Sequence, residues 1–238
     1  MENGSGPNNE GGGDQQSPIR PRTYSLIVGI AFIALIIIAG VNTLNTNNGG
    51  LLGASNEGDL PLEQFAVPDA RADVSGDANI AQDDCDSAHI PCPQDSRRTP
   101  ACEVDVPGAI RVCDLFNRPL VLSFWFTRGG SCPDEEDVFE RAYRLFKEKV
   151  NFLAIDIRDS SDKVQDLIRE HHWTHPIGLD RDGALSNLYR VGGCPTFIYA
   201  YPGGIAQSTS IGELDDQEFF SKIKNLQRLT KQRERTLR

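Results

Sequence analysis

The stretch PLVLSFWFTRGGSCPDEE, residues 119–136, decides the fold of this chain. Its first part, Pro119 to Phe126, is a short continuous apolar run, as is typical of a central strand that is buried on both faces. Glycines follow, and Cys132 then stands before Pro133 and three acidic residues, which is a helix-start signal. The stretch therefore predicts a buried strand, a turn and a helix with a cysteine at its first turn.

The flanking sequence alternates between strand and helix patterns, which predicts an α/β domain of about 130 residues with helices on both faces of one mixed sheet. The expected elements, in chain order, are a hairpin over 102–113 turning at Pro107-Gly108, the strand 119–126, a helix from Pro133, a strand over 150–157, a helix over 160–170, a short helix within 180–190, a closing hairpin of TFIYAY and IAQSTSI around 202–204, and a last helix over 215–230.

A second cysteine stands in an unusual place, in GGCPTFIY, residues 192–199. Cys194 directly precedes Pro195, and the apolar run after it predicts a strand. A proline cannot donate to a sheet ladder, so it belongs at the first position of a strand. The Cys194–Pro195 peptide is a candidate cis bond.

These motifs together resemble the thioredoxin-fold, TlpA/ResA-like family of membrane-anchored thiol–disulfide oxidoreductases. The resemblance lies in PLVLSFWFT, in DRDGALSNLYRVGGCPTFIYAYPGG at 180–204 and in IGEL at 211–214, and it covers just over half of the chain. It implies a thioredoxin-like three-layer fold, a redox role outside the cytoplasm, and protein thiols or disulfides as substrates. No cofactor is implied.

The chain departs from the family at the active-site motif. Aligned without gaps, the family's Trp-Cys-x-x-Cys falls on residues 128–132, so that Gly129 replaces the first cysteine and only Cys132 remains. This alignment also places Glu135 on a glutamate common after the motif. A gapped alternative makes Cys132 the first cysteine of a Cys-Pro-x-Glu motif, as in peroxiredoxin-like relatives.

The resemblance implies that Cys194 takes the place of the missing first cysteine as the redox partner of Cys132. In this fold the residue before the cis-proline faces the start of the active-site helix, so Cys194 is expected near Cys132 and the two are the candidate catalytic pair. The helix N-terminus and Arg128 favour a Cys132 thiolate, whereas the acids at 134–137 oppose it. The surrounding substrate-binding residues are expected to be Trp125, Arg128, Gly193 and Pro195.

Three functions fit these residues: thiol–disulfide exchange, a redox-inactive protein-binding module, and a thiol peroxidase using Cys132 with Cys194 as the resolving cysteine. No clear Pro-x3-Thr-x2-Cys signature supports the peroxidase. A bridge that is permanently locked is a further alternative.

Four more cysteines precede the strand at 119–126. We expect Cys102–Cys113 and Cys85–Cys92 disulfides, with a crossed pairing of Cys85 or Cys92 to the hairpin as the alternative. The spacings Cys-x6-Cys and Cys-x10-Cys suit zinc poorly, so no metal site is predicted. The sequence HHxxH at 171–175 is expected to be a solvated helix end.

The N-terminal part predicts membrane attachment. Tyr24 to Leu44 carries no charge over 21 residues, about 31 Å as a helix, which matches a hydrocarbon core. A cleaved signal peptide is the alternative, but the run is long for one. Arg20 and Arg22 precede it and no Lys or Arg follows until Arg71, so a cytoplasmic N-terminus and an extracytoplasmic domain are expected.

The remaining boundaries follow from composition. We expect a disordered tail at 1–22, the membrane helix at 23–44, a flexible acidic linker at 45–84 with a reach of roughly 35 Å, a cysteine-containing lead-in at 85–100, the thioredoxin-like domain at 101–230 and a basic tail at 231–238.

Net charge bears on the possible partners of the chain, and cysteine content bears on its compartment. The 238 residues carry a net charge of −10 and a pI of about 4.9, which argues against nucleic acid as a partner. The C-terminal end is the exception, because residues 222–238 hold seven Lys or Arg and one Glu. Six cysteines, an even number, suit disulfides in an oxidising compartment.

Overall fold

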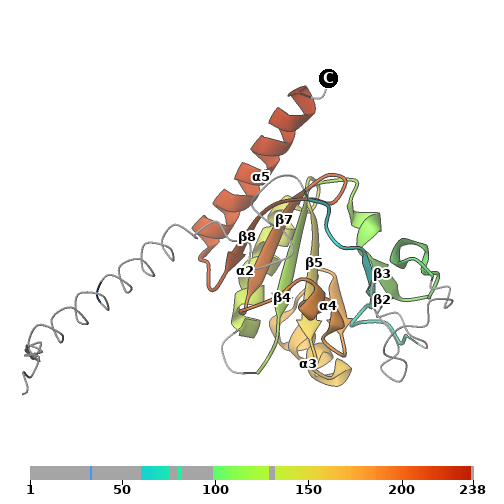
Figure 1. Ribbon diagram of the computed structural model, residues 1–238. Helices are drawn as coiled ribbons and strands as arrows, with labels where there is room; N and C mark the ends of the chain where they lie inside the picture. The colour runs from blue at the N-terminus through green and yellow to red at the C-terminus, as the bar shows by residue number, and fades with distance from the viewer. Residues whose placement is uncertain (1–32, 34–59, 75–79, 82–98, 129–131, 237–238) are drawn as a thin grey trace, which may run out of the picture. The chain divides into compact units, whose positions relative to one another are not determined.

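The computed structural model describes residues 60–74, 80–81, 99–128 and 132–236, together with Ile33. Its main sheet has five strands in the order β6-β5-β4-β7-β8 (Figure 1). These are β4 (Leu120–Trp125), β5 (Asn151–Ile157), β6 (Ile177–Asp180), β7 (Thr196–Tyr201) and β8 (Ile205–Ile211). The first three are parallel and β7 and β8 are antiparallel to their neighbours, so the sheet is mixed as predicted.

The central strand β4 is buried on both faces, which explains its continuous apolar run. Leu120, Leu122 and Phe124 belong to one hydrophobic cluster, whereas Val121 and Trp125 belong to the other. All five side chains are 0% exposed. The alternation follows from the two-residue period of a strand, and it divides the core into two layers around the sheet.

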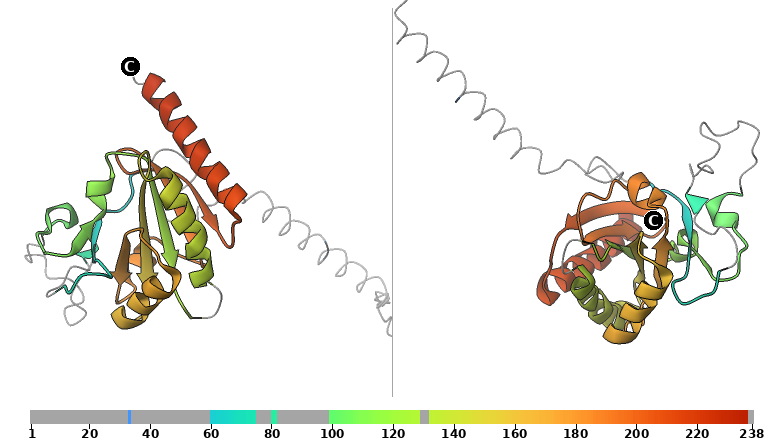
Figure 2. Two further views of the ribbon diagram at one scale, coloured as in Figure 1. Left: turned by 180° about the vertical axis from the view of Figure 1, so that it is seen from behind. Right: turned by 90° about the horizontal axis from the view of Figure 1, so that it is seen from below.

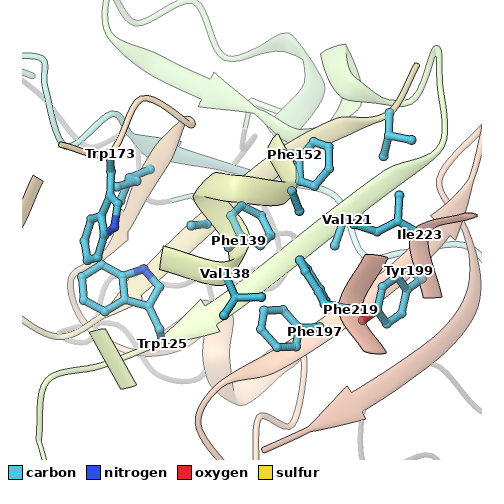
Figure 3. Packing of buried hydrophobic residues seen from close by; sticks show 14 of the residues in the cluster. Val121, Trp125, Val138, Phe139, Phe152, Trp173, Phe197, Tyr199, Phe219 and Ile223 are labelled. Atoms are coloured by element: carbon cyan, nitrogen blue, oxygen red, sulfur yellow. The ribbon is translucent and has the colours of Figure 1, made fainter. Parts of the chain in front are cut away.

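Three helices cover one face of the sheet: α2 (Cys132–Phe146), α3 (Ser161–His171) and α5 (Asp216–Thr236). Their apolar residues meet the sheet in an aromatic cluster, in which Phe139 of α2 and Phe219 of α5 lie beside Phe197 of β7 (Figure 3). The short helix α4 (Ala184–Leu188) contributes Leu185 to the cluster on the opposite face. Figure 2 shows α2 and α5 side by side.

The stretch expected to be a flexible linker is partly folded, so that part of the prediction is wrong. Strand β1 (Phe65–Pro68) is buried throughout and lies between β2 (Ile80–Ala81) and β3 (Ala109–Arg111) in a second sheet. The chain before and after β1 is tied to the main sheet, because the Leu62 amide donates to Gly204 at 2.7 Å and the Ala70 amide to Ile177 at 2.8 Å. The folded domain therefore begins about 40 residues earlier than composition indicated.

The hairpin expected at 102–113 is also absent from the described residues, although its cysteines pair. The segment forms two 3-10 turns, η2 (Ala101–Glu103) and η3 (Val112–Leu115), and β3 between them pairs with β1 rather than with a strand of its own. Cys102 and Cys113 are joined by a disulfide with Cα atoms 5.7 Å apart. A loop closed by the disulfide brings the two cysteines together without strand pairing.

Several predictions fall outside the described residues. These are the tail at 1–22, all of the candidate span at 24–44 except Ile33, the lead-in at 85–98 with Cys85 and Cys92, and Gly129. Within the described part of the chain, no helix combines the length and the apolar character needed to cross a bilayer. At the other end α5 continues to Thr236, so most of the expected basic tail is helical.

Candidate active site

The structure joins Cys132 to Cys194 in a disulfide across 62 residues of sequence, with the Cα atoms 5.9 Å apart. The sheet explains the meeting. Strands β4 and β7 are antiparallel neighbours, and Phe124 near the end of β4 pairs with Thr196 at the start of β7. The chain leaving β4 toward α2 and the chain entering β7 therefore meet at one edge, and each carries a cysteine there. The Cys194–Pro195 peptide is cis.

The two cysteines differ in exposure. Cys132 is the first residue of α2 and only 7% exposed, whereas Cys194 is partly exposed in the loop before β7. The Cys194 Sγ lies 3.9 Å from the carbonyl oxygen of Phe126. A reagent that approaches from solvent therefore reaches Cys194 more easily than Cys132.

Trp125 does not line the surface of the site. Its side chain is 0% exposed and packs edge-on against Trp173, with ring centroids 5.5 Å apart (Figure 3). The prediction of direct substrate contact through Trp125 is therefore wrong. The expectation came from the resemblance, but Trp125 lies with Val121 in the buried cluster that α2, α3 and α5 cover.

The other three expected substrate-binding residues surround the disulfide in different ways. Arg128 is exposed and its Nη2 donates to the Arg158 carbonyl at 3.0 Å. Pro195 is buried, and its carbonyl accepts from the Gly212 amide at 2.9 Å. Gly193 lies close to Ile211 of β8, where an added Cβ would come within 2.7 Å of the Ile211 Cγ2. Arg128 is thus the member of this group that offers a charged side chain to solvent.

A buried glutamate lies one helical turn after Cys132. Glu136 is 0% exposed and accepts a hydrogen bond from the Ser123 hydroxyl of β4. Burial raises the pKa of Glu136 to about 8, so it is mostly neutral at pH 7. The sequence grouped it with the solvated acids of the first turn. Its helical register with Phe139 and Glu140, at positions i+3 and i+4, was the signal that it faces inward.

His175 extends this buried network and was also missed. It is 0% exposed, its Nδ1 lies 2.8 Å from Glu140 Oε2, and its Nε2 lies 3.6 Å from Glu136 Oε2. Neither Nε2 nor Glu136 Oε2 has a hydrogen-bond partner. Burial lowers the pKa of His175. The expected solvated helix end therefore holds only for the neighbourhood of His172, because α3 ends there and the chain turns inward toward β6.

The charge of Glu140 is fixed by its donors. Burial alone would raise the pKa of Glu140, but hydrogen bonds from His175, Thr174 and Arg144 outweigh that effect and hold it well below the usual range. The network thus contains one ionised carboxylate, Glu140, and one that is mostly protonated at neutral pH, Glu136. Loss of the Glu136 proton would leave a buried negative charge to which the Ser123 hydroxyl donates, and this is why burial keeps Glu136 protonated.

A polar clamp, formed by Asp156, Asp159 and Lys163, holds Thr127 on the segment that leads from β4 to α2. Asp159 accepts from the Thr127 amide at 2.8 Å and also from the Thr127 hydroxyl, and Lys163 contacts both residues. Asp156, at 1% exposure, accepts from the Asp159 amide at 3.1 Å, and burial raises its pKa to about 8. Thr127 lies between β4 and the residues that lead to Cys132, so the clamp anchors that loop on α3 and β5.

No group of three or more His, Cys, Asp or Glu side chains within residues 60–74, 80–81, 99–128 and 132–236 is arranged to hold a metal ion.

Comparison with known proteins finds relatives of the part of the chain that holds this site. Residues 99–207 match the family model described as AhpC/TSA family. The chain is 29% identical over 113 residues to the thiol-disulfide oxidoreductase ResA of Oceanobacillus iheyensis, a match that covers 47% of this chain and 58% of that protein. It is 25% identical over 118 residues to the ResA of Bacillus thuringiensis, covering 49% and 68% of the two chains.

The fold is also found among solved structures. A thioredoxin-family thiol:disulfide interchange protein of Chlorobium tepidum superposes with a TM-score of 0.50 at 12% identity, covering 71% of this chain and 97% of that one. At this identity the likeness establishes the fold alone. The chain described here is thus similar in sequence to ResA proteins over about half its length and has a thioredoxin-like fold.

Proposed function

We propose that this chain is a membrane-tethered, extracytoplasmic thiol–disulfide oxidoreductase that acts on protein thiols and disulfides through Cys132 and Cys194. One observation carries the proposal: two cysteines from distant parts of the sequence form a disulfide at the edge where α2 and β7 begin, and one of them, Cys194, is partly exposed. The similarity to proteins named thiol-disulfide oxidoreductases supports the same chemistry.

The reaction begins at Cys194. A substrate thiolate attacks the Cys194 Sγ, the bond to Cys132 breaks, and a mixed disulfide forms between the substrate and Cys194 while Cys132 leaves as a thiolate. A second substrate thiolate then attacks the substrate sulfur and releases Cys194. The substrate loses two electrons and two protons, and the chain gains two thiols. The same steps in reverse reduce a substrate disulfide.

Two features of the surroundings of Cys132 favour a leaving thiolate, against the opposing charges of Asp134, Glu135 and Asp137. Its position at the first residue of α2 places it where the helix dipole favours negative charge. Glu136, one turn away, adds no full negative charge near neutral pH because its pKa is raised to about 8.

The tether is inferred from the uncharged run at 24–44 and from the arginines that precede it. An extracytoplasmic position suits the Cys102–Cys113 disulfide, because such bridges persist in oxidising compartments.

Insulin reduction with dithiothreitol as electron donor tests the chemistry. We expect the wild type to accelerate precipitation of insulin, and Cys132→Ser and Cys194→Ser to lose that acceleration, whereas the matched control Cys102→Ser/Cys113→Ser keeps it. Equal activity in the wild type and in Cys132→Ser/Cys194→Ser would refute the proposal. Peroxide consumption that depends on Cys132 would instead select a thiol peroxidase.

Trapping of mixed disulfides tests the order of attack. In Cys132→Ser the mixed disulfide on Cys194 lacks its resolving thiol, so substrate proteins should accumulate on this variant. In Cys194→Ser the remaining thiol is nearly buried and should trap much less. Stronger trapping by Cys194→Ser would reverse the assignment.

A further inference from the structure

The C-terminal helix α5 carries a straight stripe of positive charge that the redox site does not use. Lys224, Arg228, Lys231 and Arg235 stand at positions i, i+4, i+7 and i+11, and all four are exposed. At 100° per residue they fall within about 60° of one another around the helix, and at 1.5 Å per residue they extend over about 16 Å. We refer to these four residues as the basic stripe.

Helix stability does not explain the basic stripe. Cations favour the last turn of a helix, which accounts for Arg235, but Lys224 and Arg228 lie two turns or more before the end. Each successive pair in the stripe is three or four residues apart, a spacing at which like charges destabilise a helix. Within the described residues, none of the four forms an ion pair with a carboxylate.

The opposite face of α5 belongs to the domain. Phe219, Ile223, Leu226 and Thr230 are buried, and Arg233 lies over the Tyr201 ring at 5.0 Å. Figure 1 shows the C-terminal end of α5 rising clear of the sheet. The helix is therefore held rigidly on its apolar side and presents the basic stripe outward.

We propose that the basic stripe docks the domain onto the anionic headgroups of a phospholipid bilayer. The surface around it fits headgroups better than a protein partner. Protein interfaces are built on aromatic and apolar anchors and are depleted of lysine, and none of the exposed large apolar side chains among the described residues lies on α5. A flat anionic layer needs only a row of cations, each of which contributes about 1 kcal/mol near such a surface.

The presence of a bilayer near the domain rests on the proposed function, because the run at 24–44 would tether the chain to a membrane. The tether fixes how far the domain can move, and the basic stripe would fix which side faces the lipid. Docking through one side of α5 would hold the Cys132–Cys194 edge at a constant orientation to the membrane.

Lysine footprinting of the full chain tests the docking, and α5 supplies an internal control. Lys222 is exposed on the flank of the helix, outside the basic stripe. The chain is reconstituted into nanodiscs of phosphatidylcholine, or of phosphatidylcholine with about 30% phosphatidylglycerol, and lysine acetylation rates are measured by mass spectrometry. We expect Lys224 and Lys231 to react at least threefold more slowly in the anionic discs, with Lys222 unchanged and the difference abolished in 0.5 M NaCl.

A charge-matched pair of variants completes the test. Arg228→Gln/Arg235→Gln removes two cations from the basic stripe but keeps both reporter lysines, and should lose most of the protection. Arg181→Gln/Lys222→Gln removes two exposed cations elsewhere and should keep it. Equal rates at Lys224 and Lys231 in both kinds of disc would overturn the proposal.

Failure of the tether is separately visible. A chain that does not co-isolate with phosphatidylcholine discs contradicts the tether, and the basic stripe is then tested by flotation with preformed vesicles of the two compositions. Salt-sensitive flotation with anionic vesicles alone, lost in Arg228→Gln/Arg235→Gln, supports the docking; no flotation overturns it. Neither result depends on redox activity.

Discussion

Replacing Glu136 with glutamine should stabilise the protein relative to the wild type, by an amount that grows as the pH rises. The substitution keeps the size of the side chain and an oxygen that accepts from Ser123. Burial raises the pKa of Glu136 from 4.5 to about 8, so the unfolded chain releases this proton at a lower pH than the folded chain. The stabilising effect of the proton is complete below about pH 4.5 and is lost as the pH rises toward 8.

The magnitude follows from the shift. Each pH unit between the unfolded and folded pKa values changes the free energy of unfolding by roughly 1 kcal/mol, and the whole window by roughly 3–5 kcal/mol. Glutamine does not titrate, so the free energy of unfolding of Glu136→Gln does not fall in this way as the pH rises. Asp156 also has a pKa raised to about 8 by burial, but it is present in both proteins and cancels in the difference.

Urea unfolding of the oxidised protein at pH 5, 6, 7 and 8 measures the effect. We expect the free energy of unfolding of Glu136→Gln, minus that of the wild type, to grow by roughly 1 kcal/mol per pH unit. Glu170→Gln, which changes an exposed glutamate on α3, should follow the wild type. Parallel curves for wild type and Glu136→Gln would refute the assignment of Glu136 as a buried neutral acid.

Three further substitutions test the packing around the site, each by the free energy of unfolding in urea. Cys102→Ser/Cys113→Ser removes a disulfide between residues 11 apart in sequence and should lower the free energy of unfolding by about 3 kcal/mol on the chain-entropy model. An unchanged value would mean that the disulfide does not constrain the unfolded chain. Gly178→Ala should cost about 1–3 kcal/mol, because its Cβ would lie 2.3 Å from Val67 Cγ2, and Val67→Ala in the same chain should recover part of that loss. Asp180→Ala should cost about 1–3 kcal/mol, since its buried carboxylate accepts from two amides of α4, and an unchanged value would contradict that role.

The central strands could be predicted because strands that are buried on both faces appear in the sequence as continuous apolar runs. Residues 119–126 and 150–157 are apolar runs of strand length, and they correspond to β4 and β5. The meeting of Cys132 and Cys194 could not be obtained from spacing, because the two are 62 residues apart. It was expected only through the resemblance to a fold in which these positions face each other.

Local composition misled where tertiary contacts decide the structure. The acidic residues around Phe65 and Val67 suggested a linker, but these two side chains belong to the buried cluster formed with β4, β5 and β7. Symmetry about Gly108 suggested a hairpin, whereas the residues after it pair with β1 instead. Both errors come from partners that lie far away in the sequence.

The buried acid–base network was missed for a related reason. Glu136 stands among four consecutive acids, and charge in a first helical turn has a sufficient local explanation in the helix dipole. His175 stands just before Pro176, where a solvated helix end was expected. Only the hydrogen bond of Glu136 with Ser123 of β4 and its proximity to His175 reveal that both side chains are inside.

Thiol labelling with mass mapping of the full chain tests the central claim most directly. Without reductant, the account predicts a cross-linked peptide pair containing Cys132 and Cys194, with neither thiol labelled. After dithiothreitol both should be labelled, and removal of the reductant in the presence of a glutathione redox buffer should restore the link. Free thiols at both positions before reduction, or Cys132 bonded to another cysteine, would contradict it.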